Sequence, residues 1–396
     1  MVVAVPKWSD FGGIWTTLRD VDVNAIREEA ERPIAFACVG HETALADVSR
    51  LLSENDDRYP ASGPSPLIIM PLAEAATHAD RLRGVSLLIL AVDARRGLTP
   101  AEAAAFGRAE ALATPYLVTL VGAHAPGARV EGLPPAAAAR AISIADPSAL
   151  DAADKLANEV LRRLPSELHM AAARRLPGLR AVYARELIGN SSFSNATYAL
   201  ASGLPEQIPI LGVPFAAADM IVLTKNQAML TYRLALAYGA PPEFQARIAE
   251  ILPVIGGGFL WRQAARSLVG LIPVWGLVPK VSVAYAGTYT TGVAAWRWYE
   301  RGEVASTDQL RRISSEALAI GRARTAEIIA RARPQHTSGE SSTSGEGPLD
   351  RARAIGSGIW SGVRDRLPRL RRTRDLPGRQ RTDVDEPEPQ PRPETK

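Results

Sequence analysis

The sequence predicts an α/β domain followed by an all-α, apolar helical domain and a disordered tail. Short apolar runs alternate with helical patterns as far as residue 164, whereas only helical patterns follow as far as residue 333. Serine, glycine and proline, and then acidic residues with proline, dominate the remainder. We therefore expect a lead-in helix at 1–32, an α/β domain at 33–164, a helical domain at 165–333 and a tail at 334–396.

The composition supports a large core and argues against several functional classes. Of the 396 residues, 46% are hydrophobic and only 6% are aromatic. The 46 basic and 42 acidic residues are scattered, and a net charge of +4 does not indicate a nucleic-acid partner. The one cysteine, Cys38, excludes an internal disulfide and a cysteine zinc site, and its apolar surroundings predict an inert thiol. The five histidines lack metal-ligand spacing, so we expect neither a metal nor a cofactor.

Five apolar runs in the first domain have the length and the bounds of buried strands. They are Ile34–Val39, Leu67–Met70, Val85–Val92, Tyr116–Val121 and Ala141–Ile144. Helical patterns lie between them: Thr99 caps one that reaches Ala113, and Asp146 or Ser148 caps another that ends at Leu164. Buried runs with helices between them predict a mainly parallel sheet covered by helices on both faces.

The first run ends in Gly40 and leads into a helix, which is where a phosphate-binding loop would lie. Such a loop needs the pattern Gly-x-x-x-x-Gly-Lys-Ser/Thr, because its amides hold phosphate oxygens, its lysine neutralises charge and its hydroxyl holds magnesium. Counted from Gly40, the second glycine, the lysine and the hydroxyl fall on Leu45, Ala46 and Asp47. The side chains that bind a nucleotide are therefore missing.

Two further signals of a GTPase are also missing. Asp-x-x-Gly should follow the second run, but the chain reads MPLA from Met70. Asn-Lys-x-Asp should follow the fourth run, but the chain reads VGAH from Val121. These absences argue against nucleotide hydrolysis and leave open some other ligand at the strand ends, where open α/β sheets usually bind.

Four segments carry a resemblance to a known family. They read DVDVNAIREEAERP at Asp20–Pro33, DMIVLTKNQAMLTYRLALAYG at Asp219–Gly239, IGGGFLWRQAARSLVGLIP at Ile255–Pro273 and LVPKVSVAYAGTYTTGVAAWRWY at Leu277–Tyr299. Together they resemble the bacterial proteins that carry domain of unknown function 697, in which an Era-like GTPase domain often precedes a helical, membrane-associated domain. The resemblance implies a P-loop-GTPase-like sheet, here without its nucleotide motifs, and a membrane-associated helical domain. It brings no known catalytic residue.

Polar side chains interrupt an apolar helical pattern in the helical domain. Asn226 and Arg233 are seven residues apart and share a helix face with Asp219, whereas Lys225 lies on another face. These four residues form a candidate polar site. The alternative, which we favour, is a satisfied structural network.

Long uncharged stretches are a second feature of the helical domain. They lie at Ile208–Ala218, Ser267–Pro279 and Val281–Trp296, and the pattern around Lys280 predicts a helical hairpin with a charged tip. None reaches the roughly 18 residues of a spanning helix. Three interpretations remain open: core helices of a soluble domain, a re-entrant hairpin in a membrane, or an oligomer interface.

The tail contains a candidate lipid contact. Residues Pro348–Arg372 combine arginines with scattered apolar residues and predict a short basic amphipathic helix that would bind anionic lipid. The candidate residues are Arg351, Arg353, Trp360, Arg364 and Arg366. A solvated, disordered linker is the alternative interpretation.

These features predict a non-enzymatic pseudo-GTPase scaffold or regulator at the cytoplasmic face of the membrane. Met1 to Asp20 show no signal-peptide pattern, so we expect a cytoplasmic protein associated with the inner face of the cell membrane. The expected partners are a membrane surface or an embedded hairpin in it, a protein of unknown identity and a second copy of the chain, but no nucleic acid. Two alternatives remain open: a divergent guanine-nucleotide-binding switch, and a small membrane transport or lipid-handling module.

Overall fold

The structure is a computed structural model that describes most of the chain between residues 23 and 332. The described residues are 23–54, 56–75, 77–112, 115–124, 128–203, 212–254 and 277–332. Side chains are also left out at 79, 201–203, 212–221, 251–254, 277–280 and 325–332. The first 22 residues and the whole predicted tail, with its candidate lipid contacts, therefore lie outside the described residues.

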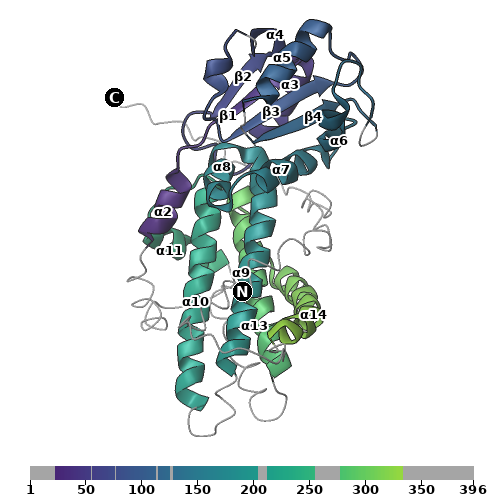
Figure 1. Ribbon diagram of the computed structural model, residues 1–396. Coiled ribbons are helices and arrows are strands. Elements are labelled where there is room, and N and C mark those ends of the chain that lie inside the picture. Colours follow the sequence, from purple (N-terminus) through teal and green to yellow (C-terminus); the bar gives the residue numbers. More distant parts are fainter. Residues whose placement is uncertain are drawn as a thin grey trace, which may run out of the picture.

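Five parallel strands form one sheet in the order β2-β1-β3-β4-β5 (Figure 1). The strands are β1 (Phe36–Gly40), β2 (Leu67–Pro71), β3 (Leu87–Asp93), β4 (Tyr116–Val121) and β5 (Ile142–Ile144). Each predicted apolar run coincides with one strand, so the predicted parallel sheet is confirmed. The order is that of a doubly wound fold whose connections change direction between β1 and β3.

Alternate residues of each strand belong to two hydrophobic clusters, one on each face of the sheet. On β1, Phe36 and Cys38 lie in one cluster, whereas Ala37 and Val39 lie in the other. The helices on the first face are α3 (Glu42–Ser53) and α7 (Ala152–Arg163). Those on the second face are α4 (Leu72–Ala75), η2 (Ala79–Leu82), α5 (Pro100–Glu110) and α6 (Pro135–Arg140). Both faces are therefore covered, as predicted.

Two predicted helix starts have different outcomes. Thr99 caps α5 as predicted, because its hydroxyl accepts a hydrogen bond from the Glu102 amide while the Glu102 carboxylate accepts one from the Thr99 amide. The start predicted at Asp146 or Ser148 is wrong, because α7 begins with Asp151 at its N-cap position. Asp146 instead accepts hydrogen bonds from the amide and the hydroxyl of Ser148, which forms a turn before the helix.

The helical domain is built around three long helices that lie side by side (Figure 1). They are α9 (Arg180–Gly203), α10 (Gly212–Ala237) and α13 (Leu277–Arg301). α9 runs away from the sheet, whereas α10 and α13 run back toward it. The end of α9 and the starts of α10 and α13 are therefore on the side of the bundle farthest from the sheet, here called the distal end. The other elements are α2 (Asn24–Glu31), η3 (Ser166–Leu168), α8 (His169–Arg175), η4 (Pro177–Leu179), α11 (Phe244–Val254) and α14 (Thr307–Ala332).

The hairpin tip predicted at Lys280 is wrong. Lys280 lies in the first turn of α13, which continues to Arg301. Pro279 is compatible with this position, because the first turn of a helix needs no amide hydrogen from it. The stretch 255–276 lies outside the described residues. Among the helices that are described, none has both the length and the apolar character that crossing a membrane would require.

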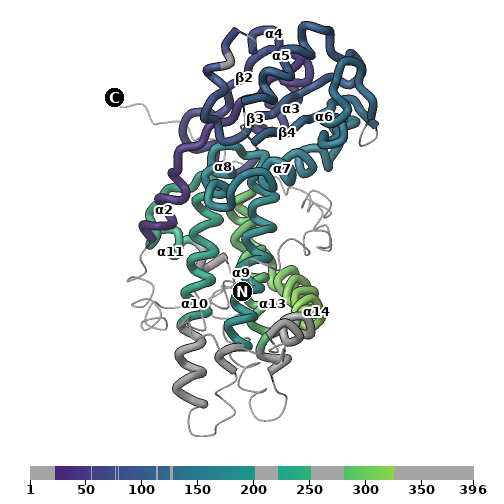
Figure 2. The backbone as a smooth tube through the Cα atoms, in the orientation of Figure 1, coloured from purple at the N-terminus to yellow at the C-terminus, as the bar shows by residue number. Residues whose placement is uncertain are grey.

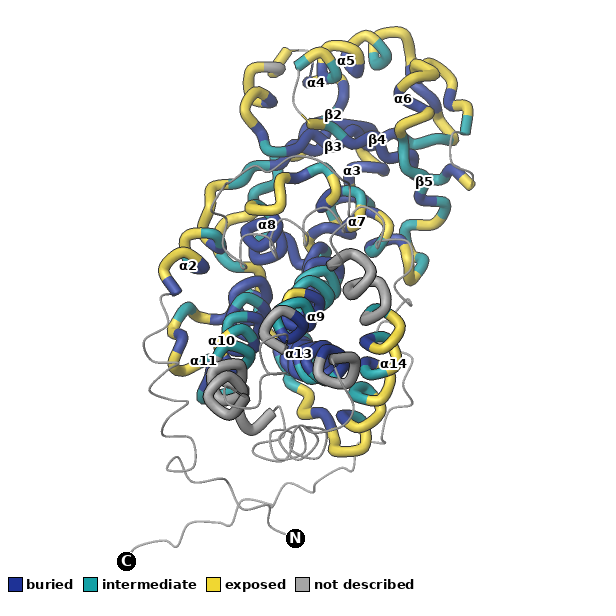
Figure 3. Tube along the Cα trace, turned by 60° about the horizontal axis from the view of Figure 1, so that its bottom comes forward, coloured by how far each residue is buried: buried dark blue, intermediate teal, exposed yellow. Residues whose placement is uncertain are grey.

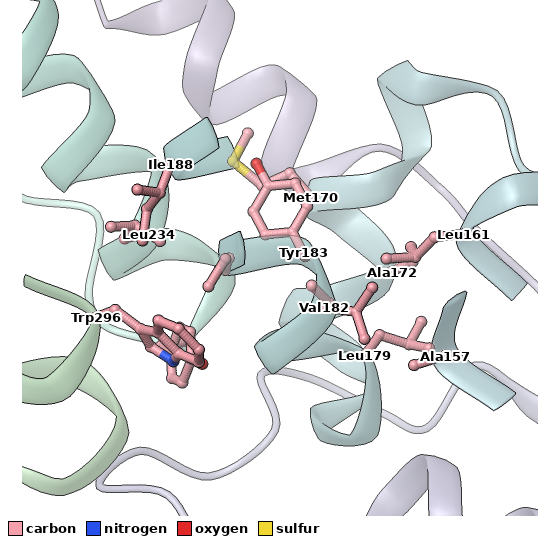
Figure 4. Packing of buried hydrophobic residues seen from close by; sticks show 14 of the residues in the cluster. Ala157, Leu161, Met170, Ala172, Leu179, Val182, Tyr183, Ile188, Leu234 and Trp296 are labelled. Carbon is pink, nitrogen blue, oxygen red and sulfur yellow. The ribbon is translucent and has the colours of Figure 1, made fainter. Parts of the chain in front are cut away.

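One hydrophobic cluster continues from the sheet into the bundle. Figure 4 shows Leu161 of α7 near Ala172 of α8, and Val182 and Leu179 beside them. Figure 2 traces the chain from α7 through α8 into α9, and Figure 3 shows the buried residues of the long helices facing the inside of the bundle. Leu164, at the predicted domain boundary, is itself buried. The α/β and helical domains therefore share one core.

A buried arginine joins the two domains. Arg180, only 1% exposed, begins α9, and its guanidinium donates to Asp57 Oδ2 at 2.8 Å. It also donates to the backbone oxygens of Tyr59 at 2.8 Å and Pro60 at 3.0 Å, and lies 5.5 Å from the ring centre of Tyr238. A buried charge with a carboxylate partner and several carbonyl acceptors is well satisfied. This contact fixes α9 to the loop between α3 and β2.

Two further contacts hold the helical domain in place. Arg58, in the same loop, lies 4.1 Å from the ring centre of Trp298 and pairs with Glu250 at 3.0 Å. The indole of Trp298 donates to the same carboxylate at 2.7 Å. Helix α2 attaches to α10 through a pair between Glu29 and Arg233 at 2.7 Å. Helix α2 and the loop between α3 and β2 are therefore both bound to the bundle.

We expect Gly40→Ala to lower the free energy of unfolding by about 3 kcal/mol or more, because the paired strands leave little room to move. A Cβ atom at position 40 would lie 1.9 Å from the backbone oxygen of Ala91 on β3. Urea unfolding followed by circular dichroism measures the change. The control is Gly107→Ala in α5, where no atom lies within 4 Å of the added Cβ; it should raise stability by up to about 1 kcal/mol. Equal losses in the two variants would contradict the argument.

Candidate functional site

The carboxyl edge of the sheet, where the five strands end, is the usual ligand position in open α/β folds. The change of direction between β1 and β3 lies beside His41 and Asp93. β1 ends at Gly40 and α3 begins at Glu42, so His41 alone connects them. A phosphate-binding loop needs several residues between strand and helix to turn its amides toward the phosphates. The described segment after β1 has no room for such a loop.

The side chain of His41 fills the space at the end of β1. It is 3% exposed, and its Nδ1 accepts a hydrogen bond from the Asp93 amide at 3.0 Å. Because Nδ1 accepts, the proton of the neutral ring is on Nε2, which is buried and makes no hydrogen bond to the described residues. Glu102 Oε1 lies 3.7 Å from this nitrogen. Burial, followed by the charge of Arg96, lowers the pKa of His41, so the ring is neutral near pH 7.

The carboxylate of Glu102 is held by local contacts. It accepts hydrogen bonds from the amide and the hydroxyl of Thr99 at 2.9 and 2.8 Å, and from Arg96 at 2.6 Å. The backbone hydrogen bond from Thr99 is the main reason that the pKa of Glu102 is lowered. This carboxylate therefore stabilises the start of α5 and is a poor general base.

The charges around the carboxyl edge do not favour phosphate. The acidic residues there are Glu42, Asp47, Asp93, Glu102 and Asp146. The first six residues of α3, Glu42–Asp47, contain no lysine or arginine. Of the nearby arginines, Arg96 is bound to Glu102, and Arg50 is bound to Asp47 and to the Pro147 oxygen. Arg95 is exposed at this edge and lies beside Gly122, which follows β4. A triphosphate would therefore meet acidic side chains and no lysine that could neutralise it.

The described residues provide neither a metal-binding group nor a reactive thiol. In this part of the chain, no group of three or more histidine, cysteine or acidic side chains could hold a metal ion. Cys38 is fully buried in β1, and burial raises the pKa of its thiol to about 12. The expectation of a buried thiol at Cys38 is confirmed, and such a thiol is unreactive.

The three candidate polar residues whose side chains are described, Lys225, Asn226 and Arg233, do not meet at one place. The side chain of Asp219 lies outside the described residues. Lys225 is exposed, whereas Arg233 is half-buried and pairs with Glu29 of α2. Arg233 therefore attaches the N-terminal helix to the bundle. A functional role for Asp219 and Lys225 stays a prediction.

Asn226, the fourth candidate, belongs to a buried hydrogen-bond network between three helices. Its Nδ2 donates to Asn195 Oδ1 at 2.7 Å, and Asn195 Nδ2 donates to Thr288 Oγ1 at 2.8 Å. The Thr288 hydroxyl donates to the Ala284 oxygen at 2.9 Å and accepts a longer bond of 3.4 Å from Gln227 Nε2. The oxygen of Gln227 is buried and makes no hydrogen bond to the described residues. The network joins α9, α10 and α13, which supports the structural interpretation of Asn226.

The residues that matter most in these contacts are not among the predicted site residues. Asn195, Thr288 and Arg180 each interrupt an apolar helical pattern, and a polar group in such a place needs a partner. Their partners could not be identified from spacing, because Asn195 and Thr288 are 93 residues apart and Arg180 and Asp57 are 123 apart. Periodicity indicates the face of a helix but not the residue that it meets.

We expect Asn195→Ala to lower the free energy of unfolding by about 2–3 kcal/mol, because it leaves Asn226 and Thr288 without their shared partner. Chemical unfolding of the full chain measures this loss. Lys225→Ala, on the exposed surface of α10, is the control and should change stability by less than about 0.5 kcal/mol. A loss of similar size in both variants would refute the role given to the network.

Comparisons with protein families, with curated proteins and with solved structures found no match for this chain. The resemblance to the proteins with domain of unknown function 697 stays a prediction from the four sequence segments. The contacts described above are therefore the basis for a functional proposal.

Proposed function

We propose that the protein is a non-enzymatic scaffold or regulator that combines a nucleotide-free, GTPase-like α/β domain with a membrane-contacting helical domain. One observation carries the first part: His41 alone connects β1 to α3 at the position where a GTPase would hold phosphates. The neutral ring accepts from the Asp93 amide and contributes no positive charge to this place. A domain of this kind offers a surface for a protein partner and no catalytic group for hydrolysis.

The glycine at the end of β1 supports the same proposal. Gly40 is the one residue of the phosphate-loop pattern that the sequence retains at this position. Its role follows from the backbone of Ala91, which lies too close for any side chain. The close approach of the Ala91 backbone is therefore sufficient to explain a glycine at position 40, without a bound phosphate.

The distal end of the bundle supports the membrane part of the proposal. The ends of α9, α10 and α13 meet there, away from the sheet (Figure 1). The sequence that leads into α13, residues 255–276, contains Trp261, Arg262, Arg266 and Trp275 and no acidic residue. Tryptophan and arginine in an apolar sequence are typical of the boundary between lipid chains and anionic headgroups.

The described surface near the distal end adds positive charge. Gly321 of α14 packs against Ser282 in the second turn of α13, since a Cβ there would lie 3.1 Å from the Ser282 oxygen. The C-terminal half of α14 is therefore close to the distal end. Arg322 is exposed on it and Arg324 is half-exposed. Basic residues near an anionic membrane surface each contribute about 1 kcal/mol to binding.

Full-length protein should show no saturable binding of GTP or ATP with magnesium at concentrations up to roughly 1 mM. The thermal unfolding midpoint checks this, because a ligand that binds only the folded state raises it in proportion to the logarithm of its concentration. Isothermal titration calorimetry gives an independent reading. A saturable rise with guanine nucleotide would refute the nucleotide-free part of the proposal and favour a divergent switch.

Full-length protein should float with anionic vesicles and remain unbound with zwitterionic vesicles. A chain that ends at Arg333 should float equally well, because the proposed contact lies in the helical domain. Trp261→Asp combined with Trp275→Asp should reduce flotation severalfold, since a charge opposes burial at the lipid boundary.

The control for this experiment is Leu150→Asp, which introduces one negative charge, against two in the double variant, at an exposed apolar residue of the α/β domain. A chain that ends at Leu164 is not a suitable control, because removing the bundle would expose the shared core. Loss of flotation only in the chain without the tail would place the lipid contact in the tail. No flotation of any form would refute the membrane part of the proposal.

A further inference from the structure

The junction between the two domains contains a buried histidine as well as charged pairs. Arg185 of α9 pairs with Asp154 of α7 at 2.9 Å, and Arg180 pairs with Asp57 at 2.8 Å. His169, at the start of α8, is 7% exposed and lies between α7 and α9. Among the residues of these contacts, it is the one whose ordinary titration range includes neutral pH.

Both ring nitrogens of His169 face hydrogen-bond acceptors. Nε2 lies 3.1 Å from the backbone oxygen of Leu164, the C-cap residue of α7. Nδ1 lies 3.6 Å from Glu186 Oε2 on α9. A neutral imidazole has one N–H group, so it can donate to only one of these acceptors. A ring with protons on both nitrogens can donate to both acceptors. Its positive charge is also favourable next to the C-terminal end of α7, where the helix dipole is negative.

We infer that His169 links the α/β domain to the helical domain only while its ring carries two protons. With both nitrogens protonated, the ring joins the end of α7 to Glu186 of α9. When Nδ1 loses its proton, its lone pair faces the Glu186 carboxylate and this contact becomes repulsive. The junction is then held by the arginine pairs and the shared core alone. This inference does not depend on the proposed function.

Other charges near α8 are engaged elsewhere. On α8 itself, Arg174 donates to backbone oxygens at the end of α10, and Arg175 donates to backbone oxygens at the end of α2. On the neighbouring helices, Arg233 of α10 and Glu29 of α2 pair with each other. Glu167 of η3 is exposed, and η4 has no charged side chain. Glu186 is therefore the charge that acts on the ring.

The direction of the pKa shift agrees with this geometry. Burial alone would lower the pKa of His169, but the nearby Glu186 carboxylate, with its negative charge, and the backbone oxygens of Leu164 and Leu161 together raise it above 6.5. The folded state therefore binds the proton more tightly than the unfolded chain. The resulting stability is fully present below pH 6.5 and is lost as the pH rises through the higher folded pKa.

His41 provides a matched comparison within the same chain. It is also buried, but its Nδ1 faces an amide donor, so the neutral ring satisfies that contact. Its pKa is lowered, chiefly by burial. Two buried histidines should therefore titrate on opposite sides of 6.5, with His169 above and His41 below.

A pH titration of the ring carbons tests the inference on full-length protein labelled at histidine. Two-dimensional NMR would follow the five histidines, with His169 assigned by the loss of its signal in His169→Gln. We expect a midpoint above 6.5 for His169, and Glu186→Gln should lower this midpoint by about one unit, a tenfold weaker affinity for the proton. A midpoint at or below 6.5, or one unchanged in Glu186→Gln, would overturn the inference. Glu186→Gln also tests it if His169→Gln does not fold.

Hydrogen exchange tests whether the protonation of His169 stabilises the junction between the two domains. Amide exchange of α8 and of the first turns of α9, corrected for the intrinsic effect of pH, should become severalfold faster between about pH 6 and about pH 8.5. His41→Gln, which removes the other buried histidine, should show the same acceleration. In Glu186→Gln the acceleration should be absent or shifted to lower pH. Equal protection at both pH values in the unaltered protein would show that protonated His169 does not link the two domains.

Discussion

The position of the whole helical domain depends on the guanidinium of Arg180. This group is buried at the start of α9 and is bound to a carboxylate and to backbone oxygens of the loop that follows α3. The same place requires Gly239 at the end of α10, since a Cβ there would lie 2.5 Å from the Pro60 oxygen. α9, α10 and the loop therefore form one rigid junction, and α13 packs against the helices that it holds.

The junction lies at the edge of the sheet opposite to the carboxyl edge. The loop at 57–60 precedes β2 and Leu164 follows α7, so both lie where the strands begin. The carboxyl edge, with His41 and Asp93, is consequently left free of the bundle. The α/β domain thus holds the helical domain at one edge of the sheet and exposes charged side chains at the other edge. In the proposed scaffold, a partner at the carboxyl edge would bind without disturbing the shared core.

The sequence alone predicts the parts of the fold that follow from local patterns. The five strands and the cap at Thr99 are such parts, because burial and helix starts leave signals within a few residues. The departure from the phosphate-loop pattern after Gly40 is also a local feature that the sequence shows directly. The start of α7 and the turn at Lys280 were predicted wrongly, since Asp146 forms a turn of its own and Pro279 is tolerated in a first helical turn. The partners of Asn195 and Arg180 could not be predicted, because distant elements bring them together.

The two buried histidines show why a residue type alone does not determine its chemistry. His41 and His169 are both nearly inaccessible to solvent. His41 directly follows β1, and the ring of His169, at the start of α8, contacts the end of α7. At His41, a backbone amide supplies a proton donor, so the ring needs only one proton of its own. At His169, a helix-ending oxygen and a carboxylate supply only acceptors, so the site favours two. Charge at these positions follows from the donors and acceptors that the fold places around each ring, and burial by itself would have assigned both as neutral.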